Sequence, residues 1–111
     1  MIKVSIMYPA TAGSRFDHEY YRDVHMPLLK SRMGDSCIAY SIDKGIAGGT
    51  PDSPPVYVGL CHIYCQSVQA FQQGFGPHAK EIMSDIKNYT DILPVIQISE
   101  VAVAAAGVED H

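Results

Sequence analysis

The most constraining feature of the chain is the order in which two kinds of hydrophobic pattern alternate along it. Four segments are strand-like, mostly with apolar residues at alternate positions, and two have apolar residues at helical spacing. The predicted strands cover residues 2–8, 37–43, 56–65 and 95–103, and the predicted helices cover residues 17–33 and 67–87. This βαββαβ order indicates an α+β, ferredoxin-like fold, a four-stranded antiparallel sheet with both helices on one face.

Local signals mark where these elements begin and end. Asp17 and Ser67 precede the helical patterns and are expected to cap them, because their side-chain oxygens can accept from free backbone N–H groups. Gly34 is expected to end the first helix, and Pro77 to begin a renewed turn of the second. The segment 45–55, rich in Gly and Pro, is predicted to be a loop.

Composition narrows the class of protein. The 111 residues have the size of one domain, and we expect that domain to cover residues 1–103, with a loose tail over 104–111. The net charge is −4 and the basic residues are scattered, which argues against binding to nucleic acid or an anionic membrane. No apolar run approaches the ~20 residues that span a bilayer, and the first residues lack a signal-peptide pattern. We therefore expect a cytoplasmic protein.

The third predicted strand suggests a partner. It is apolar on both faces, with Val58 and Leu60 on one face and Cys61 and Ile63 on the other. The helices can cover only one face of the sheet, so the other face needs a second layer, and a second copy of the same sheet is the simplest one. We expect a homodimer of the dimeric α+β barrel type.

The cysteines and the sequence motifs argue against a disulfide, a metal and a bound cofactor. Cys61 and Cys65 would lie about 13 Å apart along one strand, whereas a disulfide needs about 4.4–6.8 Å between Cα atoms. His18 and His25 would stand ~10 Å apart on one helix, too far for a shared ion. No Gly-rich nucleotide motif occurs. We expect free, buried thiols and neither metal nor cofactor.

The first helix carries the strongest functional signal. At helical spacing, an inward arc contains Tyr20, Tyr21, Val24, His25, Leu28 and Leu29. His25 is therefore expected to face the sheet with Tyr21 one turn before it, and Pro27 to distort the helix because it lacks an N–H. A proton acceptor and an oxygen-holding hydroxyl beside a helix distortion suit a small pocket. A hydrogen-bonded core histidine is the alternative.

Three other polar residues have simpler interpretations. His62, in the middle of a strand, is expected to be structural, and His78 to be a surface residue in the first turn of a helix. Asp91 is expected to be a turn residue, although its loop could also bring it to the pocket histidine, because the loop ends near one end of the sheet.

The segment from Phe16 to Leu28 follows the pattern Phe-Asp-x-x-Tyr-Tyr-x-x-x-His-Met-Pro-Leu and resembles the signature of the EthD family, named for ethyl tert-butyl ether degradation. Similar segments at 70–71, 75–78, 88–91 and 94–99 extend the resemblance over about residues 1–103. It implies a dimeric α+β barrel and an association with the oxidative breakdown of small organic molecules, often beside a haem monooxygenase system.

Two functions remain open at this point. The first is a cofactor-independent oxidoreductase, or a proton-transfer enzyme, that acts on a small hydrophobic molecule in catabolism. His25 would move the proton, Tyr21 would hold the oxygen that gains charge, and Asp91 would orient the imidazole. The pocket would be lined by Tyr20, Met26, Leu28, Phe75 and His78. The alternative is a non-catalytic binding or carrier protein that serves a monooxygenase system.

Overall fold

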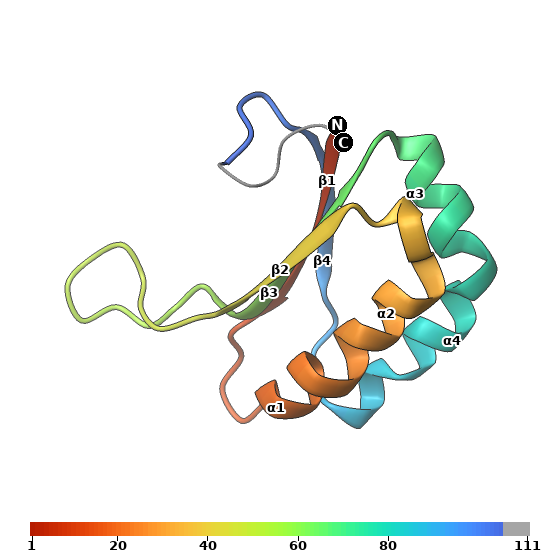
Figure 1. Ribbon diagram of the computed structural model, residues 1–111. Coiled ribbons are helices and arrows are strands. Elements are labelled where there is room, and N and C mark those ends of the chain that lie inside the picture. Colours follow the sequence, from red (N-terminus) through yellow and green to blue (C-terminus); the bar gives the residue numbers. More distant parts are fainter. Residues whose placement is uncertain (106–111) are drawn as a thin grey trace.

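The computed structural model describes residues 1–105 and has the predicted α+β architecture (Figure 1). Its strands are β1 (Ile2–Pro9), β2 (Ala39–Lys44), β3 (Tyr57–Cys65) and β4 (Val95–Glu100). They form one antiparallel sheet in the order β2-β3-β1-β4, and the helices lie on one face of it. The predicted four-stranded sheet with one covered face is thereby confirmed.

Each predicted helix is a chain of shorter helical pieces. The first comprises α1 (His18–Tyr20), the π-helical η1 (Tyr21–His25), α2 (Met26–Met33) and the 3₁₀ turn η2 (Gly34–Ser36). The second comprises α3 (Val68–Phe75), the 3₁₀ turn η3 (Gly76–His78), α4 (Ala79–Ser84) and the 3₁₀ turn η4 (Ile86–Asn88).

The predicted helix boundaries are confirmed by the hydrogen bonds that form them. A carboxylate oxygen of Asp17 accepts from the Tyr20 amide at 3.1 Å, and the Ser67 hydroxyl oxygen accepts from the Ala70 amide at 3.0 Å. The backbone of Gly34 has a φ of +57°, a conformation that glycine adopts readily, and α2 ends there.

The last strand is shorter than predicted. β4 pairs only with β1, and its final pair joins Glu100 to Ile2. Val101 still donates its amide to the Met1 carbonyl at 3.0 Å, but the strand itself ends at Glu100, before the predicted Val103. Most of the tail predicted over 104–111 lies outside the described residues.

The core lies between the helices and the covered face of the sheet. Val4 and Tyr8 of β1, Cys61 and Ile63 of β3, and Leu29 of α2 are all buried there. The cysteine thiols are free, as the spacing of Cys61 and Cys65 predicted.

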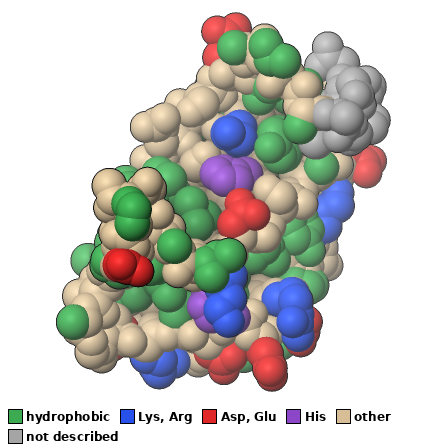
Figure 2. All heavy atoms as spheres, turned by 90° about the vertical axis from the view of Figure 1, so that its left-hand side faces the viewer, with side chains coloured by type: hydrophobic (Ala, Val, Ile, Leu, Met, Phe, Trp, Pro, Cys, Tyr) green, Lys and Arg blue, Asp and Glu red, His purple; other side chains and the backbone are tan. Residues whose placement is uncertain are grey.

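The other face of the sheet has no helix over it. Figure 2 shows this side of the molecule, where hydrophobic side chains lie around a histidine that has a basic and an acidic side chain beside it. The strand register places Met7, Leu60 and Val95 on this face, together with His62. The Nδ1 atom of His62 lies 2.8 Å from the Ser5 hydroxyl oxygen, so its surroundings fit the structural role expected for it.

Candidate functional site

The helix distortion predicted at Pro27 takes the form of a π-turn. The Met26 amide donates to the Tyr21 carbonyl, five residues earlier, and Pro27 follows with no amide hydrogen to continue the α-helical pattern. The turn buries Tyr21 and His25, whose exposed fractions are 1% and 4%. Because a π-turn accommodates one extra residue, Met26 joins the buried stripe, while Val24, expected to face inward, is 46% exposed.

The imidazole of His25 is held by a carboxylate from the other helical run. Its Nδ1 lies 2.9 Å from an Asp85 oxygen. The second Asp85 oxygen accepts from the Tyr20 hydroxyl at 2.6 Å and from the Asn88 side-chain amide at 2.9 Å. The ring of His25 also lies against Tyr89, with ring centroids 4.6 Å apart. These contacts fix both the position and the orientation of the imidazole.

The electrostatics of this pair favour a neutral base. Burial lowers the pKa of His25 below its ordinary value, although the hydrogen bond and charge of Asp85 act in the opposite direction. For Asp85, partial burial alone would raise the pKa, but hydrogen bonds from Tyr20, Asn88 and His25 bring it below the ordinary value. An ionised carboxylate can only accept, so Nδ1 of a neutral His25 carries the proton and Nε2 has a free lone pair.

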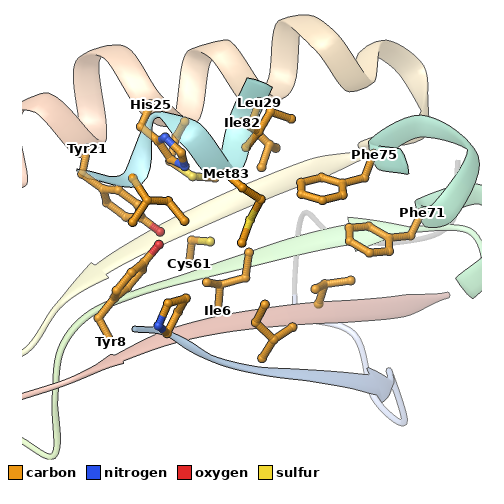
Figure 3. Close-up of a pocket in the computed structure, with 15 residues that line it drawn as sticks. Ile6, Tyr8, Tyr21, His25, Leu29, Cys61, Phe71, Phe75, Ile82 and Met83 are labelled. Carbon is orange, nitrogen blue, oxygen red and sulfur yellow. The ribbon is translucent and has the colours of Figure 1, made fainter. Parts of the chain in front are cut away.

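His25 forms part of the wall of a cavity of about 230 Å³ between the helices and the sheet (Figure 3). The lining is almost entirely apolar, and no Lys, Arg, Asp or Glu occurs among the described residues that form it. The lining residues are Val4, Ile6, Tyr8, Tyr21, His25, Met26, Leu29, Cys61, Phe71, Phe75, Ile82, Met83, Ile86, Pro94 and Ile96.

Two tyrosine hydroxyls lie at one end of this cavity. The Tyr21 hydroxyl is buried beside the Cys61 thiol and has no nitrogen or oxygen hydrogen-bond partner among the described residues. The Tyr8 hydroxyl lies 2.6 Å from that of Tyr89. Burial raises the pKa of Tyr21 above its usual range and that of Tyr8 to about 12, so both remain protonated and able to donate.

Four of the residues predicted to form the site are brought together by the fold. Tyr21, His25, Met26 and Phe75 all line the cavity. Tyr20 does not line the cavity; its hydroxyl donates to the Asp85 carboxylate that holds His25.

Three predicted site residues lie elsewhere. Leu28 is half-buried and His78 lies in η3, and neither lines the cavity, because the π-turn and the break at Gly76 shift them off the inward face. The Asp91 carboxylate accepts from the backbone amide of Arg15 at 3.0 Å and does not reach His25. The carboxylate that contacts His25 is that of Asp85.

Sequence reasoning missed Asp85 and the Tyr8–Tyr89 pair. Asp85 stands three residues after Ile82 and one before Ile86, so it borders the apolar stripe of the second helix, and that position was a usable signal. Tyr8 alternates with Val4 and Ile6 on the covered face of β1 and was equally accessible to prediction. Tyr89 follows the helix in a turn, where no periodicity indicates its direction.

The described residues contain neither a cluster of metal ligands nor a membrane-spanning helix. Within residues 1–105, no group of three or more His, Cys, Asp or Glu side chains could hold a metal ion. In the same range, no helix is long and apolar enough to cross a membrane.

Comparison with known proteins supports the fold and gives the family. No curated protein sequence matched the chain. Among solved structures, an EthD-like protein from Ralstonia eutropha is 50% identical, with 95% of each chain covered and a TM-score of 0.91. An ethyl tert-butyl ether degradation family protein from Bacillus halodurans shares 20% identity over 90% of this chain and 97% of its own, with a TM-score of 0.68. An Arabidopsis thaliana protein shares the fold with 10% identity over 95% of this chain and 99% of its own, with a TM-score of 0.66. The EthD domain model matches residues 12–92, and the chain therefore belongs to the EthD family.

Proposed function

We propose that the protein is an enzyme in which His25 acts as a general base on a small hydrophobic molecule held in the cavity. One observation carries the proposal: a buried imidazole, oriented by Asp85, forms part of the wall of an apolar cavity, and burial lowers its pKa. Positioned proton transfer of this kind typically contributes about 10²–10⁴ in rate.

The chemistry follows from the two nitrogen atoms of the ring. Nε2 takes a proton from the bound molecule, and the imidazolium that forms is stabilised by the Asp85 carboxylate at Nδ1, 2.9 Å away. The negative charge left on an oxygen of the molecule is met by the Tyr21 hydroxyl, which has a proton to donate. We place this step in the oxidative catabolism of small organic molecules, as a cofactor-independent oxidoreductase or proton-transfer enzyme.

Proton exchange tests this proposal without knowledge of the natural substrate. Acetophenone in D₂O exchanges the hydrogens beside its carbonyl when a base removes them, and NMR follows the loss of their signal. We expect wild-type protein to accelerate the exchange, and His25→Gln to fold normally but lose at least about a hundredfold of the acceleration. His78→Gln, outside the cavity, serves as the control and is expected to match wild type.

A non-catalytic carrier is the second candidate function. The almost wholly apolar lining favours it, because such a surface binds a hydrophobic molecule without help from an imidazole. A carrier would deliver the molecule to a monooxygenase system. In that case His25→Gln would bind acetophenone as wild type does, and neither protein would accelerate exchange.

We also propose that the uncovered sheet face packs against a second copy of the chain. Support comes from the half-buried and exposed apolar side chains of Met7, Leu60 and Val95 on a face without a helix. A specific interface of this kind should bury more than ~1,000 Å² in total. Sedimentation at micromolar concentration should give a dimer for wild type and a monomer for Leu60→Asp. A monomeric wild type would contradict the proposal.

A further inference from the structure

The cavity has two chemically different ends (Figure 3). At one end, the hydroxyl oxygens of Tyr8 and Tyr21 point toward each other, with the Cys61 thiol nearby. At the other end, the rings of Phe71 and Phe75 are stacked, with centroids 5.2 Å apart and planes at 16°. A ligand that fills the cavity therefore meets hydroxyl groups at one end and only hydrocarbon at the other.

The hydroxyl end has unused hydrogen-bonding capacity. Tyr21 is 1% exposed, yet its hydroxyl has no nitrogen or oxygen partner among the described residues, and the Cys61 thiol beside it is only a weak partner. Tyr8 and Tyr89 share a single hydrogen bond of 2.6 Å, whereas two hydroxyls together have two protons and four lone pairs. Tyr8 can therefore serve a second partner, and a single ligand oxygen can be met by Tyr21 and Tyr8 together.

The cavity has no permanently charged side chain to pair with a charged ligand. None of the described residues that line it is Lys, Arg, Asp or Glu, and the one carboxylate close to it, Asp85, is already shared by His25, Tyr20 and Asn88. An anion would lose its hydration and would gain a partner of opposite charge only if His25 were protonated against its lowered pKa, which is unfavourable.

The volume limits the size of the ligand. An apolar cavity of about 150 Å³ accommodates benzene. At about 230 Å³, this cavity has room for one ring with a short substituent, or for a branched molecule of equal bulk.

We propose that the ligand is an uncharged, one-ring-sized molecule whose single hydroxyl or carbonyl oxygen lies at Tyr21 and Tyr8 and whose hydrocarbon lies against Phe71 and Phe75. The chemical class of the ligand is thereby specified for the site of the proposed function, and the inference rests on that function for the identity of the site. It adds Tyr8, supported by Tyr89, as a specificity-determining residue, and it excludes carboxylates as substrates.

Three probes of nearly equal shape test the proposal by calorimetric titration of the full chain. 4-Ethylphenol, ethylbenzene and 4-ethylbenzoate differ only in the group that would reach the hydroxyl end. We expect wild type to bind 4-ethylphenol about tenfold more tightly than ethylbenzene, a ratio that corresponds to ~1.4 kcal/mol. The benzoate should bind at least about a hundredfold more weakly than the phenol.

Variants assign the preference to the hydroxyl group. Tyr21→Phe should reduce the preference for the phenol to about twofold or less, while Tyr57→Phe, a tyrosine of β3 outside the cavity, should leave it unchanged. Equal binding of phenol and ethylbenzene by wild type, tighter binding of the benzoate, or a preference that survives Tyr21→Phe would each overturn the proposal. Titration does not depend on turnover. A failure of His25 as a base would leave these ratios unchanged, and a failure of the ratios would leave the proton-exchange result unaffected.

Discussion

Replacement of Asp85 by Asn changes the hydrogen-bonding role of one atom and should reverse the tautomer of His25. The carboxylate accepts three hydrogen bonds, from His25 at 2.9 Å, Tyr20 at 2.6 Å and Asn88 at 2.9 Å. An asparagine at this position keeps one oxygen, which can still accept from Tyr20 and Asn88. Its NH₂ group then faces Nδ1 of His25, which must become the acceptor, so the ring proton moves to Nε2. The nitrogen proposed to act as the base is thereby blocked.

The cost to stability follows from the same three contacts. A hydrogen bond to a charged group contributes about 1.5–3 kcal/mol and a neutral one about 0.5–1.5 kcal/mol. In Asp85→Asn, the hydrogen bond to the buried His25 changes from one with a charged carboxylate to one with a neutral amide, and this change accounts for most of the lost stability. The free energy of unfolding should fall by about 1–3 kcal/mol. The fold should be retained.

Two measurements read these effects separately. Correlation spectra of ¹⁵N-labelled protein distinguish the two imidazole tautomers, and urea denaturation gives the free energy of unfolding. Asp23→Asn is the control, because Asp23 is an exposed aspartate on the helical run of His25 and its partner among the described residues is Arg22; its effect should stay within about 0.5 kcal/mol. A His25 that keeps its proton on Nδ1 in Asp85→Asn would refute the reasoning.

Three further predictions concern stability. Burial holds the pKa of His25 in the folded protein below its value in the unfolded chain, so the unfolded chain binds more protons between these two pKa values. The free energy of unfolding should therefore fall as the pH drops below about 6.5. In urea titrations, His25→Gln should flatten that decline. Tyr21→Phe removes a hydroxyl without a nitrogen or oxygen partner and should leave the empty protein equally stable or about 1 kcal/mol more stable. Tyr89→Phe leaves the buried Tyr8 hydroxyl without its partner and should cost about 1–3 kcal/mol. A larger loss of stability for Tyr21→Phe than for Tyr89→Phe would contradict these hydrogen-bond assignments. Gly74→Ala places a Cβ 2.6 Å from a Cβ of η2 and should cost about 1–3 kcal/mol, while Gly76→Ala meets nothing within 4 Å and should be tolerated in thermal melts.

Local chemistry explains why so much of the fold was predictable from sequence. Asp17 and Ser67 cap helices through bonds to amides three residues away, and Gly34 ends a helix through its own backbone conformation. The alternation in β1 and β3 determines which side chains share a face of the sheet. None of these features depends on contacts between distant parts of the chain.

The site was less predictable because its decisive contacts are distant in sequence. His25 and Asp85 are 60 positions apart, and the choice between Asp85 and Asp91 depends on how the second helical run packs against the first. Pro27 predicted a distortion, but the form of that distortion, a π-turn that exposes Val24 and buries Met26, depends on packing against the sheet.

The pH dependence of acetophenone exchange tests most directly whether His25 is a neutral base in the cavity. A base must be unprotonated to act, and burial keeps the pKa of His25 below the ordinary value of 6.5. The acceleration by wild type should therefore rise with pH, reach half its maximum below pH 6.5 and remain level through neutral pH, and His25→Gln should lack this profile. An acceleration that falls as pH rises toward 7, or an identical profile in His25→Gln, would contradict the account.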